Sequence, residues 1–461
     1  MSQSTEPPAT ATGRSPEPDD GPQPGDVSAD VGRANPTQLL TPQARRLVGL
    51  AVPAAVIGIG TSLSLLLVSG VAEALEHWLW NDLPAALGVD ANGPAWIFGL
   101  LTLTGLGVGL VIVFAPGHAG DDPATEGLVA PVLPLPTLPG LLLATVLVLA
   151  GGVSLGPEYP IMAINIAITF AIGSRVIARI PGRAWIGLAF AGTIGALFGT
   201  PVAAALLLSE SMTASDEPLW DRLFAPLVAA AAGAQTTMAL GGATFALAVP
   251  DYPGIQVGDI LSACVVSVVA AVLAMVAVYA FPISHAFFSR FRHPVLITLA
   301  GGVALGILGA IGGPITLFKG LHQMQELTDN ASTYSAAALA AIALIKLAAL
   351  VVAATSRFRG GRIFPAVFVG VAFGLFASTL LPGIPIPIGV SAGVLGILLA
   401  ITRSGWLAIF MGIALVPDTQ LLPVICIAAL PAWLVVTGRP IMQVAPEPPP
   451  SPEPQPAAAA A

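Results

Sequence analysis

Charged residues are scarce in this chain: Asp, Glu, Lys and Arg make up 9% of its 461 residues, whereas soluble globular proteins carry roughly 25%. A soluble enzyme of this length could not cover its surface with so few charges. There are only two cysteines, Cys264 and Cys426, and both lie inside apolar runs, so they support neither a disulfide framework nor a metal cluster. No basic stripe is present to neutralise phosphates, which argues against a nucleic-acid partner.

Hydrophobic sequence is abundant instead, at 55% of the chain, and it is interrupted by 50 glycines and 43 prolines. The apolar residues form long blocks without a Gly-x-y period, which excludes a collagen or a flexible linker. A membrane-spanning helix needs about 20 apolar residues. The runs that meet this length are 47–70, 95–115, 138–155, 260–281 and 294–312. The composition therefore predicts a polytopic, multi-pass protein of the cell inner or plasma membrane, with the lipid bilayer as its surroundings.

Two polar tails flank the apolar region. Residues 1–46 and 446–461 are rich in Pro and small or polar residues, a mixture that predicts disorder. The membrane domain is then 47–445. Arg45 and Arg46 stand directly before the first apolar run, which indicates a cytoplasmic N-terminus, and we expect the C-terminus on the same side.

The remaining apolar runs are short or broken, and Gly or Pro separates many of them. Strands would require alternating hydrophobicity, which is absent, so the fold class is all-α with many tilted, partly spanning helices. Broken helices are tolerated at membrane depth only where they are buried or line a watery cavity. These short or broken runs are 161–173, 184–198, 201–209, 223–240, 335–356, 364–380, 387–402, 406–416 and 421–437.

Two halves of the membrane domain, about 47–240 and 256–445, carry matching helix breaks. The segments Gly156-Pro-Glu-Tyr-Pro160 and Gly361-Arg-Ile-Phe-Pro365 share the pattern G-x-x-x-P, and each opens an apolar run. A second break follows each one, at Pro201 and at Gly405, after 45 and 44 residues. Interrupted segments at corresponding places in two halves predict the substrate site of a transporter built from an inverted repeat.

The GPEYP segment places an acid at a helix start. Pro157 suits a first helical position, and Glu158 then falls in the first turn, beside free N–H groups and the positive end of the helix dipole. A carboxylate there would compete with a permeating anion, so we predict that Glu158 is a gate and a proton carrier. The alternative is an acid that only satisfies the N–H groups of its helix.

The second segment, GGRIFP, would complete the ion site. The N–H groups of Arg362, Ile363 and Phe364 could point at the same ion, and the neighbouring arginines make the approach electropositive. Lys346 is alone in an apolar run, so it needs a carbonyl, acid or water partner, and both an ion-path role and a structural role stay open.

These motifs resemble those of the CLC chloride channel and transporter superfamily. GPEYP is similar to its G-K/R-E-G-P motif, FGTPVA to its F-N-A-P-x-A segment and GRIFP to its G-x-F-x-P motif. The sequences of the two motifs, GPEYP and GRIFP, are similar to those of a divergent bacterial branch of ion-transport proteins of the YfeO type. The resemblance implies a homodimer with one pore per subunit, an inverted-repeat helical fold and anions, chloride above all, held at helix N-termini. We expect no cofactor, no metal ion and no enzymatic activity.

Residue by residue, the resemblance gives Glu158 the gating role. It assigns ion binding to the residues of the two motifs and to Met442, which stands where the family has a tyrosine. The anion-coordinating serine of the family is absent, and Asp121 and Asp122 stand in the corresponding segment. These two acids are therefore candidates for the inner entrance of the pore. An Asp N-cap before Pro123 is the alternative for them. The ion-binding candidates are Gly156, Pro157, Tyr159, Pro160, Gly361, Arg362, Ile363, Phe364, Pro365 and Met442.

The proton relay of the family is also altered. Its glutamate, the second acid of a pair, is Ser211 here, which leaves Glu210 as the candidate proton path or as a helix-end structural acid. We therefore expect channel-like or weakly coupled anion transport, with a proton-coupled antiporter as the alternative. A different class, an intramembrane enzyme acting on a lipid diphosphate, would need a second acidic cluster facing Asp121 and Asp122, and the sequence has none.

Overall fold

The computed structural model describes residues 41–127, 129–177, 180–212, 217–242 and 245–445. The tails predicted to be disordered lie outside the described residues, except that α1 already begins at Pro42. Residues 1–49 and 50–461 form separate units, and the arrangement described below concerns the second.

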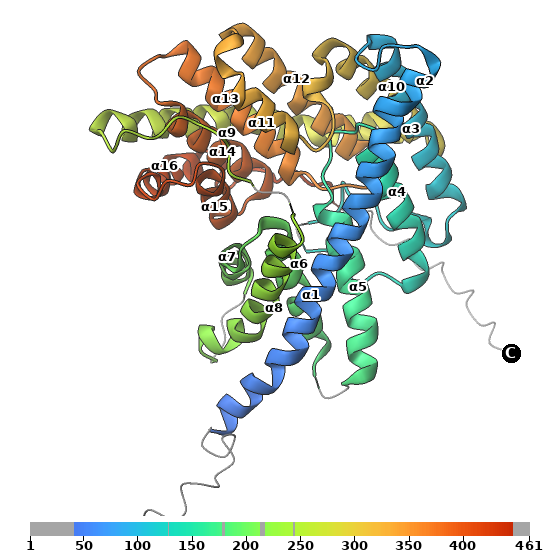
Figure 1. The fold of residues 1–461 in the computed structure, drawn as a ribbon, viewed down its shortest axis with the longest axis vertical. Helices are drawn as coiled ribbons and strands as arrows, with labels where there is room; N and C mark the ends of the chain where they lie inside the picture. Colours follow the sequence, from blue (N-terminus) through green and yellow to red (C-terminus); the bar gives the residue numbers. More distant parts are fainter. Residues whose placement is uncertain (1–40, 128, 178–179, 213–216, 243–244, 446–461) are drawn as a thin grey trace, which may run out of the picture. The chain divides into compact units, whose positions relative to one another are not determined.

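The described part of the chain is almost wholly helical (Figure 1). One isolated bridge is its only β-type pairing. Short 3-10 or π turns occur at Trp78–Asp82, Pro116–Ala119, Leu135–Thr137, Pro314–Thr316 and Ala331–Thr333. The α-helices are α1 (Pro42–His77), α2 (Leu83–Leu87), α3 (Pro94–Phe114), α4 (Leu138–Ala150), α5 (Glu158–Val176), α6 (Gly182–Phe198), α7 (Pro201–Ser211), α8 (Leu219–Ala239), α9 (Val257–Ser289), α10 (Pro294–Gly312), α11 (Leu321–Asp329), α12 (Ala336–Thr355), α13 (Ile363–Leu380), α14 (Ile386–Thr402), α15 (Gly405–Leu415) and α16 (Leu421–Val436).

Seven helical segments of the described chain are long and apolar enough to cross a membrane. Four of the five predicted spans are among them, in α1, α3, α9 and α10. The fifth is wrong: the run 138–155 forms only the 13-residue α4, which spans about 20 Å of a hydrocarbon layer about 30 Å thick. Gly151 and Gly152 end this helix, and Gly152 has a positive φ of 85° that continues no α-helix.

The second part of each half repeats the same series of helices. Three pairs correspond: α5 and α13 have 19 and 18 residues, α6 and α14 have 17 each, and α7 and α15 have 11 each. Thr200 and Ser404 cap α7 and α15, each with a side-chain oxygen that accepts a backbone N–H. Both second breaks predicted from the sequence are therefore helix starts of the same construction.

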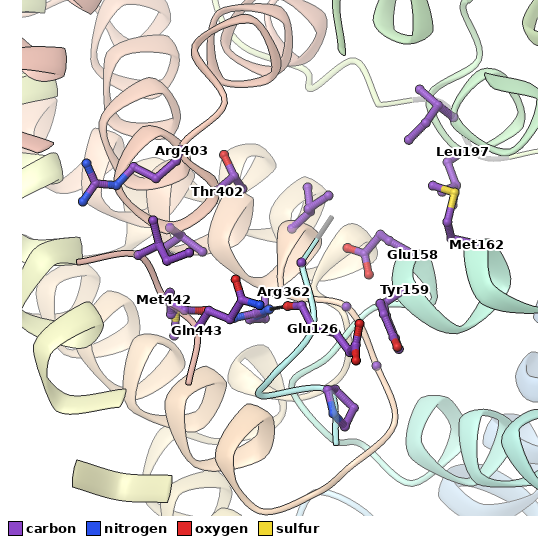
Figure 2. A pocket seen from close by; sticks show the side chains of 18 of the residues that line it. Glu126, Glu158, Tyr159, Met162, Leu197, Arg362, Thr402, Arg403, Met442 and Gln443 are labelled. Carbon is purple, nitrogen blue, oxygen red and sulfur yellow. Dashed lines mark hydrogen bonds between the residues drawn. The ribbon is translucent and has the colours of Figure 1, made fainter. Parts of the chain in front are cut away.

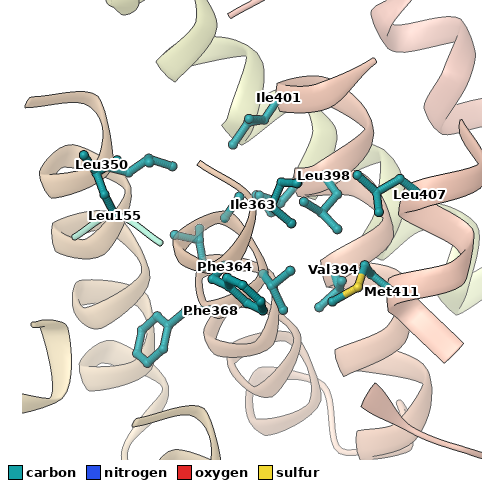
Figure 3. Close-up of a cluster of buried hydrophobic side chains, with 14 of the residues drawn as sticks. Leu155, Leu350, Ile363, Phe364, Phe368, Val394, Leu398, Ile401, Leu407 and Met411 are labelled. Carbon is teal, nitrogen blue, oxygen red and sulfur yellow. The ribbon is translucent and has the colours of Figure 1, made fainter. Parts of the chain in front are cut away.

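Helix α13 lies at the centre of the second half. Its membrane-length window is 83% buried, the largest share of the seven. Glycines let α14 approach it closely, because a Cβ on Gly374 would overlap the carbonyl of Gly389. Apolar side chains of α12, α13, α14 and α15 then fill the space around its first turns, including Leu350, Phe364 and Leu398 (Figure 3). The start of α13 is thus held on a rigid scaffold.

Candidate anion site at paired helix starts

The two G-x-x-x-P segments meet in space. Gly156 and Gly361 form an isolated antiparallel bridge, in which the Gly156 N–H donates to the Gly361 carbonyl at 2.9 Å and the Gly361 N–H donates to the Gly156 carbonyl at 2.7 Å. Helices α5 and α13 begin two residues after these glycines. The bridge therefore fixes two helix N-termini, one from each half, against each other. Pro157 is the N-cap of α5 rather than its first residue, one position earlier than predicted.

Glu158 reaches from the start of one helix to the start of the other. Its Oε1 accepts a hydrogen bond of 2.7 Å from the backbone N–H of Phe364, in the first turn of α13. The side chain is 4% exposed, and Oε2 has no hydrogen-bond partner in the described part of the chain. A Cβ on either Gly156 or Gly361 would overlap the carboxylate. The two glycines are therefore needed at these positions so that an anionic group can sit between the helix starts.

A cavity of about 280 Å³ adjoins this carboxylate (Figure 2). Glu158, Tyr159 and Met162 line one side, and Arg362, Thr402 and Arg403 line another. The remaining lining residues are Pro123, Glu126, Gly127, Ile194, Leu197, Phe198, Gly360, Gly361, Ile363, Ile401, Ile441, Met442 and Gln443. We call this space the Glu158 cavity.

A second cavity, of about 390 Å³, lies against Pro157 and Phe364, and we call it the Phe364 cavity. It shares Leu197 with the Glu158 cavity. The ring of Phe364 stacks on Phe245 with centroids 5.4 Å apart, which holds one wall of this space. The hydrogen bond between Glu158 and Phe364 therefore joins a residue that lines one cavity to a residue that lines the other.

The cationic groups of the Glu158 cavity bind backbone oxygens. Arg362 donates to the carbonyl of Met442 and, at 2.7 Å, to that of Glu126. Arg403 likewise donates to the carbonyls of Val436, Arg439 and Pro440. Neutral carbonyl partners do not cancel the guanidinium charges, so both arginines contribute positive potential to the cavity, against the carboxylates of Glu126 and Glu158 that also line it.

Glu126 is a second acid that lines the same cavity. Its pKa is raised, first by burial and then by the nearby charges of Asp121 and Asp122. Figure 2 shows its carboxylate beside the ring of Tyr159. The Tyr159 hydroxyl is buried and has no hydrogen-bond partner among the described residues.

Asp121 and Asp122 do not line the Glu158 cavity. The helix expected at Pro123 is absent, because residues 123–125 form a turn. Asp122 nevertheless makes a cap-like contact, since its Oδ1 accepts the N–H of Ala124 at 3.0 Å. Its Oδ2 lies 3.1 Å from His285 Nε2 and 3.5 Å from Arg357 Nε. Burial raises the pKa of Asp122, but the hydrogen bonds with His285 and Ala124 outweigh it and hold that pKa below its usual range.

The loop that contains these acids is tied to the GRIFP segment by Arg359. This arginine is 3% exposed and donates to the carbonyls of His118, Gly120 and Asp121 at distances of 2.5 to 3.0 Å. Gln443 and Val444, near the end of the described chain, bind the carbonyls of Thr125 and Ala124. The GRIFP segment, the 118–126 loop and the C-terminal segment therefore form one assembly.

Two other singled-out groups lie away from the Glu158 cavity. Lys346 is fully buried in α12 and donates to the carbonyls of Thr316, Leu317 and Phe318 at 3.0, 2.7 and 2.7 Å. Glu210, at the end of α7, accepts a short hydrogen bond from the Ser404 hydroxyl and one of 3.0 Å from the Gly405 N–H. Each is engaged by backbone or capping groups, which favours a structural role.

The structure brings together half of the predicted ion-binding residues. Tyr159, Gly361, Arg362, Ile363 and Met442 line the Glu158 cavity with Glu158. Pro157 and Phe364 line the second cavity, Gly156 forms the bridge, and Pro160 and Pro365 are buried outside both linings.

The sequence reasoning missed several residues of the two cavities. Glu126, Arg403 and Gln443 line the Glu158 cavity, and Lys319 lines the Phe364 cavity. Glu126, Lys319 and Gln443 lie outside the helices and away from the two G-x-x-x-P motifs, while Arg403 is the C-cap of α14, two residues before the predicted break at Gly405. For Glu126, Lys319 and Arg403 the signal was their charge, which is rare in this chain, whereas the neutral Gln443 carried none.

A family model and individual relatives identify the same kind of protein. The sequence pattern of the family described as "Voltage gated chloride channel" matches residues 98–437. Relatives from Escherichia coli and Shigella flexneri, each named "Putative ion-transport protein YfeO", are 53% identical over 407 residues, covering 88% of this chain and 97% of theirs.

Two solved structures share the fold. One is a slow cyanobacterial Cl⁻/H⁺ antiporter, with a TM-score of 0.71 and 16% identity, covering 87% of this chain and 96% of its own. The other is a CLC-type fluoride/proton antiporter, with a TM-score of 0.64 and 21% identity, covering 85% and 95%. At these identities the likeness concerns the fold.

Proposed function

The chain belongs to the voltage gated chloride channel family, and from this premise we propose that it moves small inorganic anions, chloride first among them, through a pore gated by Glu158. The observation that carries the proposal is the hydrogen bond of 2.7 Å from the Phe364 N–H to the Glu158 carboxylate. A carboxylate held there occupies the place that an anion would take at the start of α13.

The gate works by competition for that N–H group. While Glu158 is ionised and bound, its charge and volume exclude an anion from the space between the two helix starts. When an arriving anion displaces it, or when a proton neutralises it, the side chain swings away and the two cavities connect. The glycine backbone at both starts leaves room for either occupant.

The Glu158 cavity offers an anion two cationic side chains without a tight cage. Arg362 and Arg403 supply charge, while Met442 offers no hydroxyl group at the position that resembles a family tyrosine. Weak, multiple contacts favour passage over retention. The inferred role of the protein is therefore transport and not catalysis.

Proton coupling is inferred to be weak. Ser211 stands at the position that resembles the relay acid, and Glu210 is engaged by Ser404 and Gly405. The alternative, a proton-coupled antiporter, is consistent with the activities named for the two structural neighbours. Stoichiometric proton pumping driven by an imposed chloride gradient would favour that alternative.

Flux measurements with the purified protein in liposomes test the proposal. We expect efflux of chloride, and we compare it with fluoride and nitrate under the same voltage clamp by valinomycin and potassium. Empty liposomes are the control. If none of the three anions leaves protein-containing liposomes faster than empty ones, the proposed function is wrong.

The assembly and orientation belong to the same proposal. We infer a homodimer with one pore per subunit, both termini in the cytoplasm and residence in the cell inner or plasma membrane. Mass measurement in detergent checks the dimer, and protease accessibility of the two tails in oriented vesicles checks the orientation.

A further inference from the structure

Lys319 lies between two cavities on the Phe364 side of Glu158. It lines the Phe364 cavity and also a polar cavity of about 370 Å³, and Ser69 and Glu73 line both with it. Glu73 stands one turn before the C-terminal end of α1. With the N-terminus in the cytoplasm, as proposed, that end of α1 faces the outside, so these cavities form the outer approach to Glu158.

Lys319 and Glu73 are the charged residues among those that line the Phe364 cavity. Lys319 Nζ lies 4.0 Å from Glu73 Oε1, and the two side chains are 22% and 59% exposed. An ion pair of this length and exposure contributes only about 0–1 kcal/mol. An arriving anion can therefore compete with Glu73 for the ammonium group.

The helix that follows Lys319 adds positive potential at this point, against the acids Glu73 and Glu76 that line the cavity of about 370 Å³ with Lys319. Lys319 precedes the first residue of α11 by two positions, and that residue, Leu321, also lines the Phe364 cavity. The N-terminal end of this nine-residue helix carries a partial positive charge.

The position of Lys319 is fixed by the segment before it. The carbonyls of Thr316, Leu317 and Phe318 all bind the buried ammonium group of Lys346. The Phe318 N–H donates to the carbonyl of Gly152 at 3.0 Å. The backbone that presents Lys319 is thus anchored from two sides, while its side chain faces the two cavities.

We propose that Lys319 recruits the transported anion: its ammonium group binds a small inorganic anion in the Phe364 cavity, in exchange for Glu73, before the anion reaches the contact between Glu158 and Phe364. The inference rests on the proposed function and names a binding station of the same pore. If this site operates, the anion flux depends on the ammonium charge of Lys319, a residue that lies in neither G-x-x-x-P motif.

Initial chloride influx at low chloride and low ionic strength is the test. We expect Lys319→Gln to lower the rate by about tenfold and Lys319→Glu to lower it further, within the range that electrostatic steering gives. Lys319→Arg keeps the charge and retains most of the rate. Glu73→Gln removes the carboxylate that competes with chloride for Lys319, so it raises the rate of chloride influx. About 1 M salt reduces all these differences, because it screens charges beyond about 3 Å.

Arg175→Gln is the matched control, since Arg175 is exposed and lines neither cavity. It removes one cation and is expected to leave the rate unchanged. If Lys319→Gln transports like wild type at low chloride, the inference is overturned while the proposed function stands. It is also overturned if Lys319→Arg loses as much as Lys319→Gln and salt changes neither, because Lys319 then acts only in structure. Absence of flux in the wild type would instead reject the proposed function itself.

Discussion

Glu158 sits between two glycines that no other residue could replace without moving it. Its carboxylate bonds to the Phe364 N–H, and a Cβ on Gly361 would overlap the carboxyl group. A single methyl group added at position 361 would therefore displace the Glu158 carboxylate from the start of α13.

Gly361→Ala is expected to release Glu158 from α13 and to raise chloride flux severalfold in liposomes. The added methyl group and the carboxylate cannot occupy the same space, and the backbone is anchored by its bridge to Gly156. In a double variant with Glu158→Ala the effect should vanish, since coupled residues are not additive.

The control is Gly187→Ala, on α6, where a Cβ would meet nothing within 4 Å. It makes the same chemical change in a helix and should keep the wild-type flux. Equal flux in Gly361→Ala and Gly187→Ala would mean that the carboxylate does not control passage from its observed position.

At the scale of elements, the loops that connect the helices are held by buried cations. Lys346 binds the three carbonyls of residues 316–318, and Arg359 binds three carbonyls of the 118–121 turn. Neither cation binds a carboxylate in these contacts. These side chains supply hydrogen-bond donors to carbonyls of irregular backbone that lie outside any α-helix.

Lys346→Met is expected to destabilise the protein by about 1–3 kcal/mol, because buried carbonyls lose their donor. Thermal unfolding in detergent measures this as a lower midpoint temperature. Leu344→Met is the control on the same helix, at a residue that is 52% exposed. A Lys346→Met variant as stable as Leu344→Met would contradict the role of Lys346 in anchoring the loop.

Asp122 gives the 118–126 loop a dependence on pH. Burial alone would raise the folded-state pKa of this carboxyl group. The hydrogen bonds with His285 and Ala124 lower it, and the net result is a folded-state pKa below the unfolded value. Between the folded-state and the unfolded-state pKa, the native state therefore binds fewer protons than the unfolded state. The stabilisation is fully present above about pH 4 and is lost as the pH falls through the lower folded-state pKa.

Asp122→Asn should accordingly cost about 2 kcal/mol near neutral pH, the range of a hydrogen bond to a charged group, and almost nothing in strong acid. Unfolding of the two proteins across the acid range measures the difference. Asp329→Asn, at an exposed position on α11, is the control. A constant difference between Asp122→Asn and wild type at every pH would show that ionisation of Asp122 is not responsible.

At the scale of the whole molecule, most helices and their breaks were predictable, because apolar run length and Gly or Pro punctuation fix them locally. Helices α13 and α14, for example, follow the runs 364–380 and 387–402 within one residue. The spanning helices were not all predicted correctly: the run 138–155 forms only the short α4, and the runs 161–173, 335–356 and 364–380, predicted to be short or broken, form the membrane-length α5, α12 and α13.

The contact between Gly156 and Gly361 was only implied, by the matched motifs. The places of Lys319, Arg403 and Glu126 in the cavities were not predicted, because tertiary folding alone brings these residues, distant in sequence, to the same spaces.

Anion efflux from liposomes containing Glu158→Ala, compared with wild type and with Glu210→Gln, tests the central claim most directly. Glu210 is an acid at the end of α7 that caps another helix outside the Glu158 cavity. We predict that Glu158→Ala raises uncoupled chloride flux about tenfold, the factor that corresponds to about 1.4 kcal/mol, at the lower end for a hydrogen bond to a charged group, while Glu210→Gln leaves it unchanged. Equal flux in wild type and Glu158→Ala would contradict the account.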